Sequence, residues 1–283
     1  MLRNTFLHLP NIGRKTEKSL WRQGCSDWDC LLDGLDRYSV GTADREEIRH
    51  ELMVSKAALN LGEHQYFARL LGQAEAWRAW PEFRHKAVYL DIETDGGMDE
   101  EAITVIGMYA PAETAKCEVS SIESRANGSS LSTQHSTPNS SFTALVKGED
   151  LENFRDIISK YSMIVTFFGH GFDIPVLQRR FPGLRMDQIH LDLCPALRKV
   201  GYRGGLKRIE KQFGIERSEE TAGLGGYDAV KLWRSYMRMG NESALEKLIA
   251  YNREDCVSLL PLAEAAYKRL RRDTLHIEPA LAL

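Results

Sequence analysis

The first part of the chain has apolar residues at helical spacing. They recur near the helical period after a turn at residues 11–13, and further helices are expected over residues 28–35 and 42–71. Three aromatic residues precede the first predicted strand and are expected to pack in the core or between domains: Trp77, Trp80 and Phe83. These features predict a small helical N-terminal region.

From residue 88 onward, the pattern changes to short apolar runs rich in β-branched residues. Four strands are predicted, at residues 88–94, 102–109, 142–146 and 163–168. A helix over residues 150–161 separates the last two strands, and the remainder is expected to be mostly helical. Strands that alternate with helices, after opening strands able to pair as hairpins, predict an α/β fold. Its mixed sheet would be flanked by helices.

A serine-rich stretch separates the second and third predicted strands. Residues 120–142 contain few apolar side chains. Because such a segment has little apolar surface to bury, we expect a flexible insertion here.

The composition is that of an ordinary globular protein. Of 283 residues, 43% are hydrophobic and 27% are charged, and the formal net charge of −3 argues against a basic surface over the whole protein. Five cysteines without a CxxC pair fit a reducing compartment. We find no signal-peptide pattern and no apolar run near the ~18 residues of a membrane span, so we expect a cytoplasmic protein with no membrane partner. Without a GxxxxGK[ST] phosphate loop, no use of ATP is indicated.

The stretch AVYLDIETDGG places two carboxylates on a predicted buried strand. Because side chains alternate along a strand, Asp91 and Glu93 share one face, while Leu90 and Ile92 point into the core on the other. Taken alone, the pair also fits a strand end with two solvated acids.

Two further acidic positions lie beside strongly apolar sequence. Asp173 follows a strand and a glycine-rich turn, just before a helix expected to begin near residues 174–175, where it could simply be the N-cap. In YNREDCVSLL, Tyr251 and Asp255 lie one helical turn apart and share a face. A core tyrosine and a surface aspartate are the alternative interpretation of that pair.

Together, the four carboxylates would crowd negative charge unless something compensated it. Divalent cations that prefer oxygen ligands, Mg²⁺ or Mn²⁺, are the natural compensation. Two such ions about 3.5–4 Å apart form the arrangement that supports displacement at phosphorus.

The order LDIET, FDIPVL, YNRED resembles the DEDD exonucleases of the ribonuclease H-like superfamily, in their tyrosine-containing branch. More closely, the chain resembles the YprB-type family of predicted 3′–5′ exonucleases. Besides YLDIET and YNRED, the segments that carry this resemblance are LHLPNIGRKTEKSLW, FARLL with WRAWPEF, HLDL and LKRIEKQFGIER. The chain departs from the family at Phe168, where an asparagine is common; this bears on substrate affinity or activity.

The resemblance implies a role for each motif residue. Asp91, Glu93, Asp173 and Asp255 would bind two divalent cations, and Tyr251 would orient the attacking water. It also implies a ribonuclease H-like exonuclease domain at residues 86–275, after a helix-hairpin-helix-like segment at 1–36 and a helical connector at 37–85. The expected activity is hydrolysis of phosphodiester bonds in DNA or RNA, at single-stranded 3′ ends.

Two segments are candidates for binding nucleic acid. LPNIGRKTEKSLW resembles a helix-hairpin-helix turn, whose backbone N–H groups at a helix N-terminus suit a phosphate. The residues expected to contribute are Asn11, Ile12, Gly13, Arg14 and Lys15. A helix-start turn with exposed basic side chains is the alternative.

The second segment is RKVGYRGGLKRIEK, where basic residues outnumber acidic ones. We expect Arg203 and Lys207 to contact nucleic acid, Tyr202 to be able to stack on a base, and Thr94 to add a contact beside the acidic strand. A solvated helix face is the alternative interpretation of this basic segment.

Other functional classes stay open at this point. A structure-selective ribonuclease of the same fold and a non-catalytic nucleic-acid-binding module are the two alternatives to an exonuclease. His170 and His190 flank the second acidic motif and are interpreted as structural residues, because no zinc-ligand pattern accompanies them.

Overall fold

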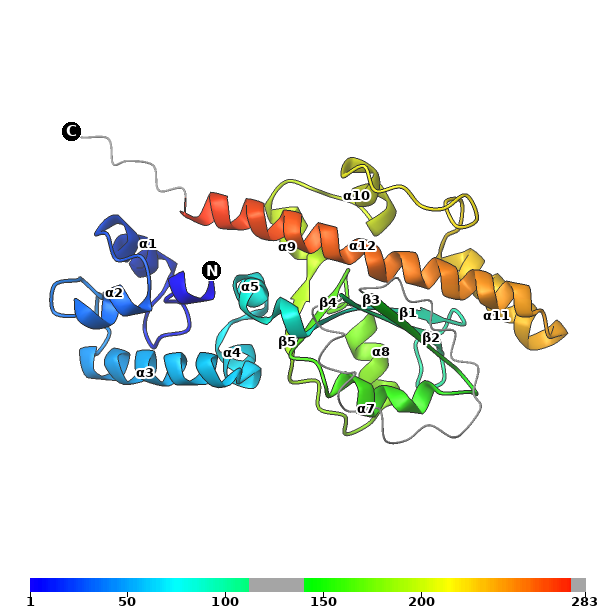
Figure 1. Ribbon diagram of the computed structural model, residues 1–283, viewed down its shortest axis with the longest axis horizontal. Helices are drawn as coiled ribbons and strands as arrows, with labels where there is room; N and C mark the ends of the chain where they lie inside the picture. Colours follow the sequence, from blue (N-terminus) through cyan, green and yellow to red (C-terminus); the bar gives the residue numbers. More distant parts are fainter. Residues whose placement is uncertain (112–139, 276–283) are drawn as a thin grey trace.

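The computed structural model describes residues 1–111 and 140–275 (Figure 1). In chain order its 3₁₀ helices (η), α-helices and strands are η1 Leu2–Asn4, α1 Arg14–Arg22, α2 Trp28–Asp33, α3 Arg45–Leu61, α4 His64–Leu70, η2 Gln73–Ala79, α5 Trp80–Phe83, η3 Arg84–Lys86, β1 Ala87–Thr94, β2 Ile103–Pro111, β3 Ser140–Val146, η5 Leu151–Asn153, α7 Phe154–Ile158, β4 Met163–Thr166, α8 Asp173–Arg180, β5 Ile189–Asp192, α9 Leu193–Lys199, α10 Leu206–Gln212, α11 Gly226–Met239 and α12 Glu242–Leu275. Of the predicted insertion, residues 120–139 lie outside the described residues, and 140–142 begin β3.

The described strands form one mixed sheet in the order β3-β2-β1-β4-β5. β1, β2 and β3 pair antiparallel, whereas β4 is parallel to β1 and β5 is parallel to β4. Parallel neighbours need a crossover, and α7 and α8 precede β4 and β5 respectively. The carboxyl ends of β1, β4 and β5 therefore lie at one edge. This architecture confirms the predicted α/β fold with a mixed sheet.

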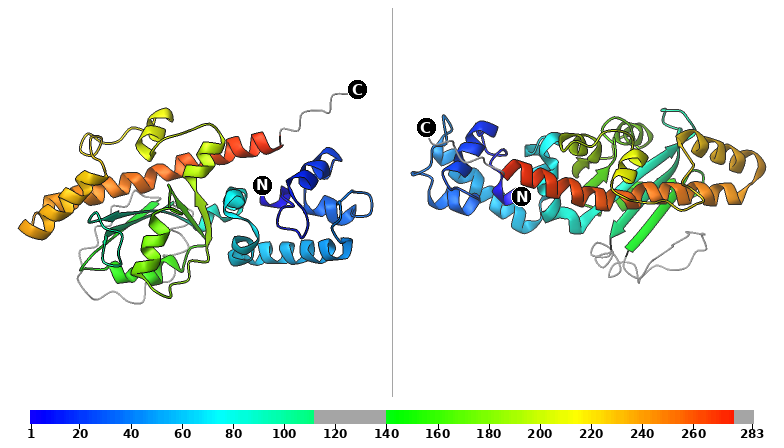
Figure 2. Two further views of the ribbon diagram at one scale, coloured as in Figure 1. Left: turned by 180° about the vertical axis from the view of Figure 1, so that it is seen from behind. Right: turned by 90° about the horizontal axis from the view of Figure 1, so that it is seen from above.

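Helices cover both faces of the sheet (Figures 1 and 2). The long helix α12 crosses one face, and α7 and α8 lie against the other. Leu90 and Ile92 of β1 are buried with residues of α7 and α8, while Tyr89 is buried on the opposite face. The alternation predicted for the LDIET strand is thus confirmed for its apolar residues.

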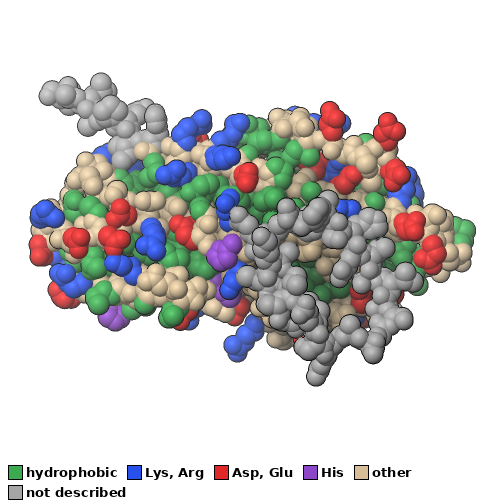
Figure 3. All heavy atoms as spheres, viewed as in Figure 1, with side chains coloured by type: hydrophobic (Ala, Val, Ile, Leu, Met, Phe, Trp, Pro, Cys, Tyr) green, Lys and Arg blue, Asp and Glu red, His purple; other side chains and the backbone are tan. Residues whose placement is uncertain are grey.

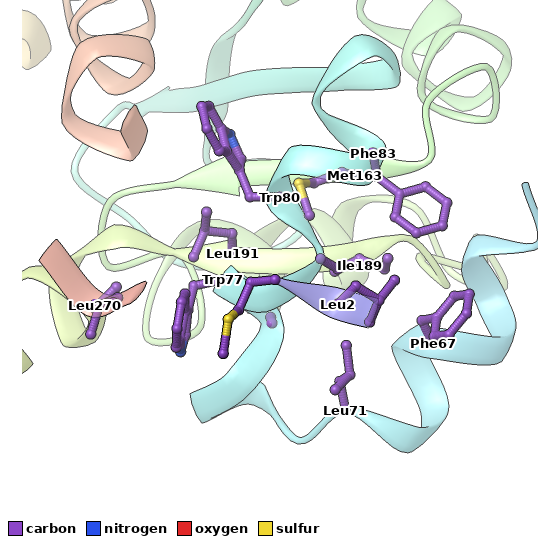
Figure 4. Packing of buried hydrophobic residues seen from close by; sticks show 14 of the residues in the cluster. Leu2, Phe67, Leu71, Trp77, Trp80, Phe83, Met163, Ile189, Leu191 and Leu270 are labelled. Carbon is purple, nitrogen blue, oxygen red and sulfur yellow. The ribbon is translucent and has the colours of Figure 1, made fainter. Parts of the chain in front are cut away.

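The N-terminal helices and the sheet share one hydrophobic core. Figure 4 shows Leu2 of η1 and Phe67 of α4 beside Ile189 of β5, with Leu270 of α12 at the far side of the cluster. The aromatic residues Trp77, Trp80 and Phe83 are buried in this cluster, as their sequence position predicted. The core therefore contains residues from all three segments proposed from sequence.

A buried ion pair joins α1 to η2, which lies just before the first strand. Glu17 of α1 and Arg78 of η2 lie 3.1 Å apart, and both side chains are almost fully buried. Glu17 also accepts hydrogen bonds from Thr5 Oγ1 at 2.7 Å and from the Phe6 backbone N–H at 2.8 Å. Because both oxygens of this carboxylate have partners, its burial is compensated.

The structure differs from the sequence expectation at three main places. The helix expected over residues 42–71 is divided into α3 and α4, because Gly62 ends α3 with a left-handed backbone. β5 lies in the part expected to be mostly helical, and the helix predicted over 150–161 is a 3₁₀ turn followed by the short α7. A strand of four residues is too short to show an alternating pattern, and β5 is defined by its parallel pairing with β4. In the described ranges, no helix combines the length and the apolar character needed to cross a membrane.

Candidate functional site

Three of the predicted carboxylates meet between β1 and α12. Asp91 and Glu93 extend from β1 and Asp255 extends from α12, and one oxygen of each lies within 4.8 Å of the others. Glu93 and Asp255 are buried, and Asp91 is partly exposed. Two elements far apart in sequence therefore bring three oxygen ligands to one point, a donor set that suits a divalent cation.

Asp173 lies next to this group without belonging to it. It is the first residue of α8, and its Oδ1 accepts a hydrogen bond at 3.3 Å from the backbone N–H of Ile92 in β1. The N-cap position is Phe172, so the capping role considered from sequence is wrong. The bond to Ile92 instead holds this buried carboxylate at the β1 strand between Asp91 and Glu93.

Negative charge dominates the electrostatics of the site. Burial raises the pKa of Asp91 well above its usual value, and the charges of Asp255 and Glu93 raise it further. Burial and the Asp255 charge likewise raise the pKa of Glu93, and burial raises the pKa of Asp173 to about 7. Such a site favours any ligand that brings positive charge, and hard divalent cations fit both its charge and its oxygen atoms.

Arg217 compensates part of this charge from the loop after α10. Its guanidinium donates two hydrogen bonds of 2.7 Å to the buried carboxylate of Glu210, and Nη2 also pairs with Asp255. Burial raises the pKa of Asp255, and the ion pair with Arg217 opposes that rise. Asp255 is therefore oriented by an arginine that is itself held by two hydrogen bonds to Glu210, and no spacing in the sequence indicates these contacts.

Tyr251 lies one helical turn before Asp255, as the sequence predicted. Its ring is buried, with Lys207 Nζ 4.5 Å and Arg217 Cζ 5.6 Å from the ring centroid. Burial and the nearby carboxylate of Asp255 raise the pKa of the phenol, so the hydroxyl stays neutral and can both donate and accept.

Asn252 orients Asp91, and sequence reasoning missed this role. Its Nδ2 donates to Asp91 Oδ2 at 2.9 Å. The amide has room because Gly107, which faces Asp91 across the β1–β2 pair, has no side chain. A Cβ at Gly107 would lie 1.8 Å from Asn252 Oδ1. The signal was present in two parts: a glycine inside an apolar strand, and an asparagine inside the YNRED motif.

The N-terminal turn proposed to bind phosphate contains both buried and exposed residues. Asn11 adopts a left-handed backbone with φ of 60°, Ile12 is buried in the core, and Gly13 is the N-cap of α1. Arg14 is exposed but pairs with Glu75 at 2.5 Å, and Lys15 is exposed. A 3₁₀ helix and turns precede the turn, so within the described chain an α-helix flanks it on one side only.

The residues near α10 that were predicted to contact nucleic acid differ in their surroundings. Lys207 lies at the site beside Tyr251, whereas Arg203 is exposed in the loop before α10. Tyr202 packs on Phe213 at 4.5 Å between ring centroids and under Arg269, so its ring is already engaged. Thr94 ends β1, and its Oγ1 accepts from the Gly96 N–H at 3.3 Å.

His170 and His190 stack with ring centroids 4.0 Å apart. His170 contacts Asp192 and His190 contacts Thr166 Oγ1 at 2.8 Å. Neither belongs to the group of metal-ligating side chains found in residues 1–111 and 140–275. Both histidines therefore have structural partners.

Phe168 lies at the carboxyl end of β4, in the turn that leads to Asp173. Its backbone is left-handed, with φ of 68°, and 55% of the residue is exposed. Its N–H donates to Asp192 Oδ1 at 2.8 Å, which fixes the turn. Asparagine tolerates this backbone conformation better than phenylalanine does.

Comparison with known proteins places this geometry in a family. No curated protein and no solved structure matches the chain at a significant level. A family model does: that of the RNase_H superfamily matches residues 88–267. This range covers the sheet of the described structure except the first residue of β1, and it contains Asp91, Glu93, Asp173 and Asp255. The chain therefore belongs to the RNase_H superfamily, whose members are usually nucleases that act on nucleic acid.

Proposed function

We propose that this chain is a metal-dependent 3′–5′ exonuclease that hydrolyses phosphodiester bonds of DNA or RNA. The observation that carries the proposal is the convergence of Asp91, Glu93 and Asp255 within 4.8 Å. Asp173 lies beside them, held to Ile92 of the same strand. The order of these motifs and the tyrosine before Asp255 support the exonuclease assignment over other RNase_H activities.

In this proposal the carboxylates hold two divalent cations, Mg²⁺ or Mn²⁺. When bound, these ions supply an activated water and stabilise the leaving 3′ oxygen. Asp91 is oriented by Asn252 and Asp255 by Arg217, so two of the ligands are fixed before any cation binds. Tyr251, whose phenol stays neutral, positions the attacking water by a hydrogen bond.

The nucleic-acid strand would approach along the carboxyl edge of the sheet. Thr94 and Lys207 border the carboxylates and would contact the strand near the reacting phosphate, with exposed Arg203 further out. On the face shown in Figure 3, Lys and Arg side chains gather over the C-terminal part of α12. The turn from Asn11 to Lys15, which leads into α1 near the C-terminal end of α12 in Figures 1 and 2, would supply a sequence-independent contact.

End-labelled DNA and RNA oligonucleotides incubated with Mg²⁺ or Mn²⁺ test the proposal. A ladder that shortens from the 3′ end supports it. Internal cuts would instead indicate a structure-selective ribonuclease, and binding without cleavage a non-catalytic module. Asp91→Ala should abolish hydrolysis, while Asp36→Ala, which removes an exposed carboxylate, should not. Equal activity of the two variants would point to a contaminating nuclease.

Tyr251→Phe tests the role of the Tyr251 hydroxyl separately from that of its ring. The variant keeps the packing against Lys207 and Arg217 and removes only the group assigned to the water. We expect kcat to fall about 10²-fold, the lower end for losing a positioned proton donor or acceptor. Unchanged kcat would remove Tyr251 from the mechanism.

A further inference from the structure

Two cationic side chains meet at the ring of Tyr251 with hydrogen-bond donors to spare. Lys207 extends from α10 and Arg217 from the loop that follows it, and both lie against the same ring. The Arg217 side chain is only 7% exposed. Lys207 as a residue is only partly buried, and the charge of Arg217 acts on it. The carboxylates of Asp255, Glu210 and Glu93 lie near enough to offset part of this repulsion.

The guanidinium of Arg217 is held in one orientation. Nε and Nη2 bind the two carboxylate oxygens of Glu210, and Nη2 also reaches Asp255. These hydrogen bonds use Nε and Nη2, so Nη1 takes no part in holding Glu210 or Asp255. Among the described residues, Arg217 Nη1 has no hydrogen-bond acceptor although it is buried, and the same holds for Lys207 Nζ.

Buried donors without acceptors are rare, because each costs free energy that a bound acceptor would recover. Here two such donors carry positive charge and lie beside a carboxylate cluster. Guanidinium and ammonium groups are the side chains that bind phosphate oxygens most strongly. The pair therefore has the charge, the donors and the position of a phosphate-binding site.

We propose that Lys207 Nζ and Arg217 Nη1 form a phosphate subsite that holds one backbone phosphate of the nucleic-acid strand next to the carboxylate cluster. The identity of the ligand rests on the proposed function, which supplies a phosphodiester strand at this place.

A chemical double-mutant cycle tests the subsite without hydrolysis. Single-stranded oligonucleotides with one neutral methylphosphonate in place of a phosphate, at each of the three linkages nearest the 3′ end, are bound to the full chain in chelator. Fluorescence anisotropy gives Kd for the wild type and for Lys207→Met, which keeps the aliphatic stem over Tyr251. Lys211→Met is the matched control, since Lys211 is exposed on the same helix.

Lys207→Met should weaken binding of the all-phosphate strand about tenfold, the effect of one charge-assisted hydrogen bond. At one linkage the methylphosphonate should abolish this difference, because the variant and the neutral linkage remove the same contact. Lys211→Met should show no such coupling. Additive effects at all three linkages, or equal coupling for both lysines, would overturn the proposal.

Arg217 is tested by a conservative variant, because truncation would leave buried Glu210 unpaired. Arg217→Lys keeps a charge beside Glu210 and Asp255 and removes the Nη1 donors. It should couple to the same linkage as Lys207→Met; coupling to none would restrict Arg217 to orienting Asp255 and overturn the paired subsite. Since no step requires hydrolysis, coupling in a chain without nuclease activity would refute the proposed function and retain the subsite.

Discussion

The amide of Asn252 in α12 donates to the carboxylate of Asp91 in β1 at 2.9 Å, and its oxygen lies over Gly107 of β2, where an added Cβ would be 1.8 Å from it. This contact joins the two elements that contribute the acidic residues. Asn252 is fully buried, so its orientation is fixed by packing. It is a positioning residue: it acts on the site by holding Asp91.

Asn252→Ala should therefore weaken metal binding while leaving the fold intact. Loss of a hydrogen bond that orients a metal ligand typically costs about 10–100-fold in affinity. Mn²⁺ titration followed by electron paramagnetic resonance measures the change, and circular dichroism checks the fold. Asn60→Ala, at an exposed position of α3, is the control. An unchanged Mn²⁺ affinity would show that Asp91 needs no support from Asn252.

Gly107→Ala should disturb the contact between Asn252 and Asp91 by placing a methyl group against the Asn252 amide. The new Cβ would lie 1.8 Å from Asn252 Oδ1 and 2.8 Å from Cys256 Sγ, so α12 or the Asn252 side chain must shift. We expect a loss of about 1–3 kcal/mol in unfolding free energy. Chemical denaturation measures it, with Gly223→Ala, which meets open space, as the control.

The clash at Gly107 has a specific partner, which a second variant can remove. Asn252→Ala in the Gly107→Ala background should recover part of the lost stability, because the amide that the Cβ meets is gone. The alternative outcome is that Asn252→Ala lowers the unfolding free energy equally in the wild type and in the Gly107→Ala background. The two substitutions would then be independent, and the close approach to Asn252 would not be the cause of the stability lost in Gly107→Ala.

Part of the acidic site was predictable, because the periodicity of a strand or a helix determines which side chains point the same way. Residues two apart on a strand share a face, and residues four apart on a helix share a face, so the pairs Asp91–Glu93 and Tyr251–Asp255 followed from spacing alone. That the two pairs would meet did not follow from spacing. It came from the resemblance of the ordered motifs to a known family.

The partners of these residues were not predictable, because they depend on tertiary packing. Arg217 lies 38 positions before Asp255 in an irregular loop, so neither helical nor strand periodicity applies to it. The bond from the Ile92 N–H to Asp173 likewise depends on how α8 packs under β1. A capping role for Asp173 was reasonable from local sequence, and tertiary structure overrode it.

The buried pair of Arg78 and Glu17 should contribute far more to stability than a surface pair. Arg78→Met leaves the carboxylate of Glu17 buried without its cation, for which about 3–5 kcal/mol is expected. Lys231→Met, which breaks the exposed pair with Asp228, should cost at most about 1 kcal/mol. Urea unfolding followed by tryptophan fluorescence compares the two. Equal losses would mean that Arg78 does not hold α1 in place.

His8 should make stability depend on pH. It is 5% exposed and packs on Trp28, and among the described residues neither ring nitrogen has a hydrogen-bond partner. Burial lowers its pKa from 6.5 to about 3. Below pH 6.5 the unfolded chain therefore binds a proton that the folded chain does not, so stability falls as pH falls.

His8→Leu removes this proton uptake. Between pH 7.5 and 5.5 the wild type should lose about 1.4 kcal/mol more unfolding free energy than the variant, the equivalent of one pKa unit. Above pH 7.5 the difference between the two should be constant. Urea titrations at several pH values measure both slopes. His50→Leu, at a histidine whose side chain is 74% exposed, should keep the wild-type slope. Parallel curves for the wild type and His8→Leu would show that His8 takes up its proton equally in the folded and unfolded chain.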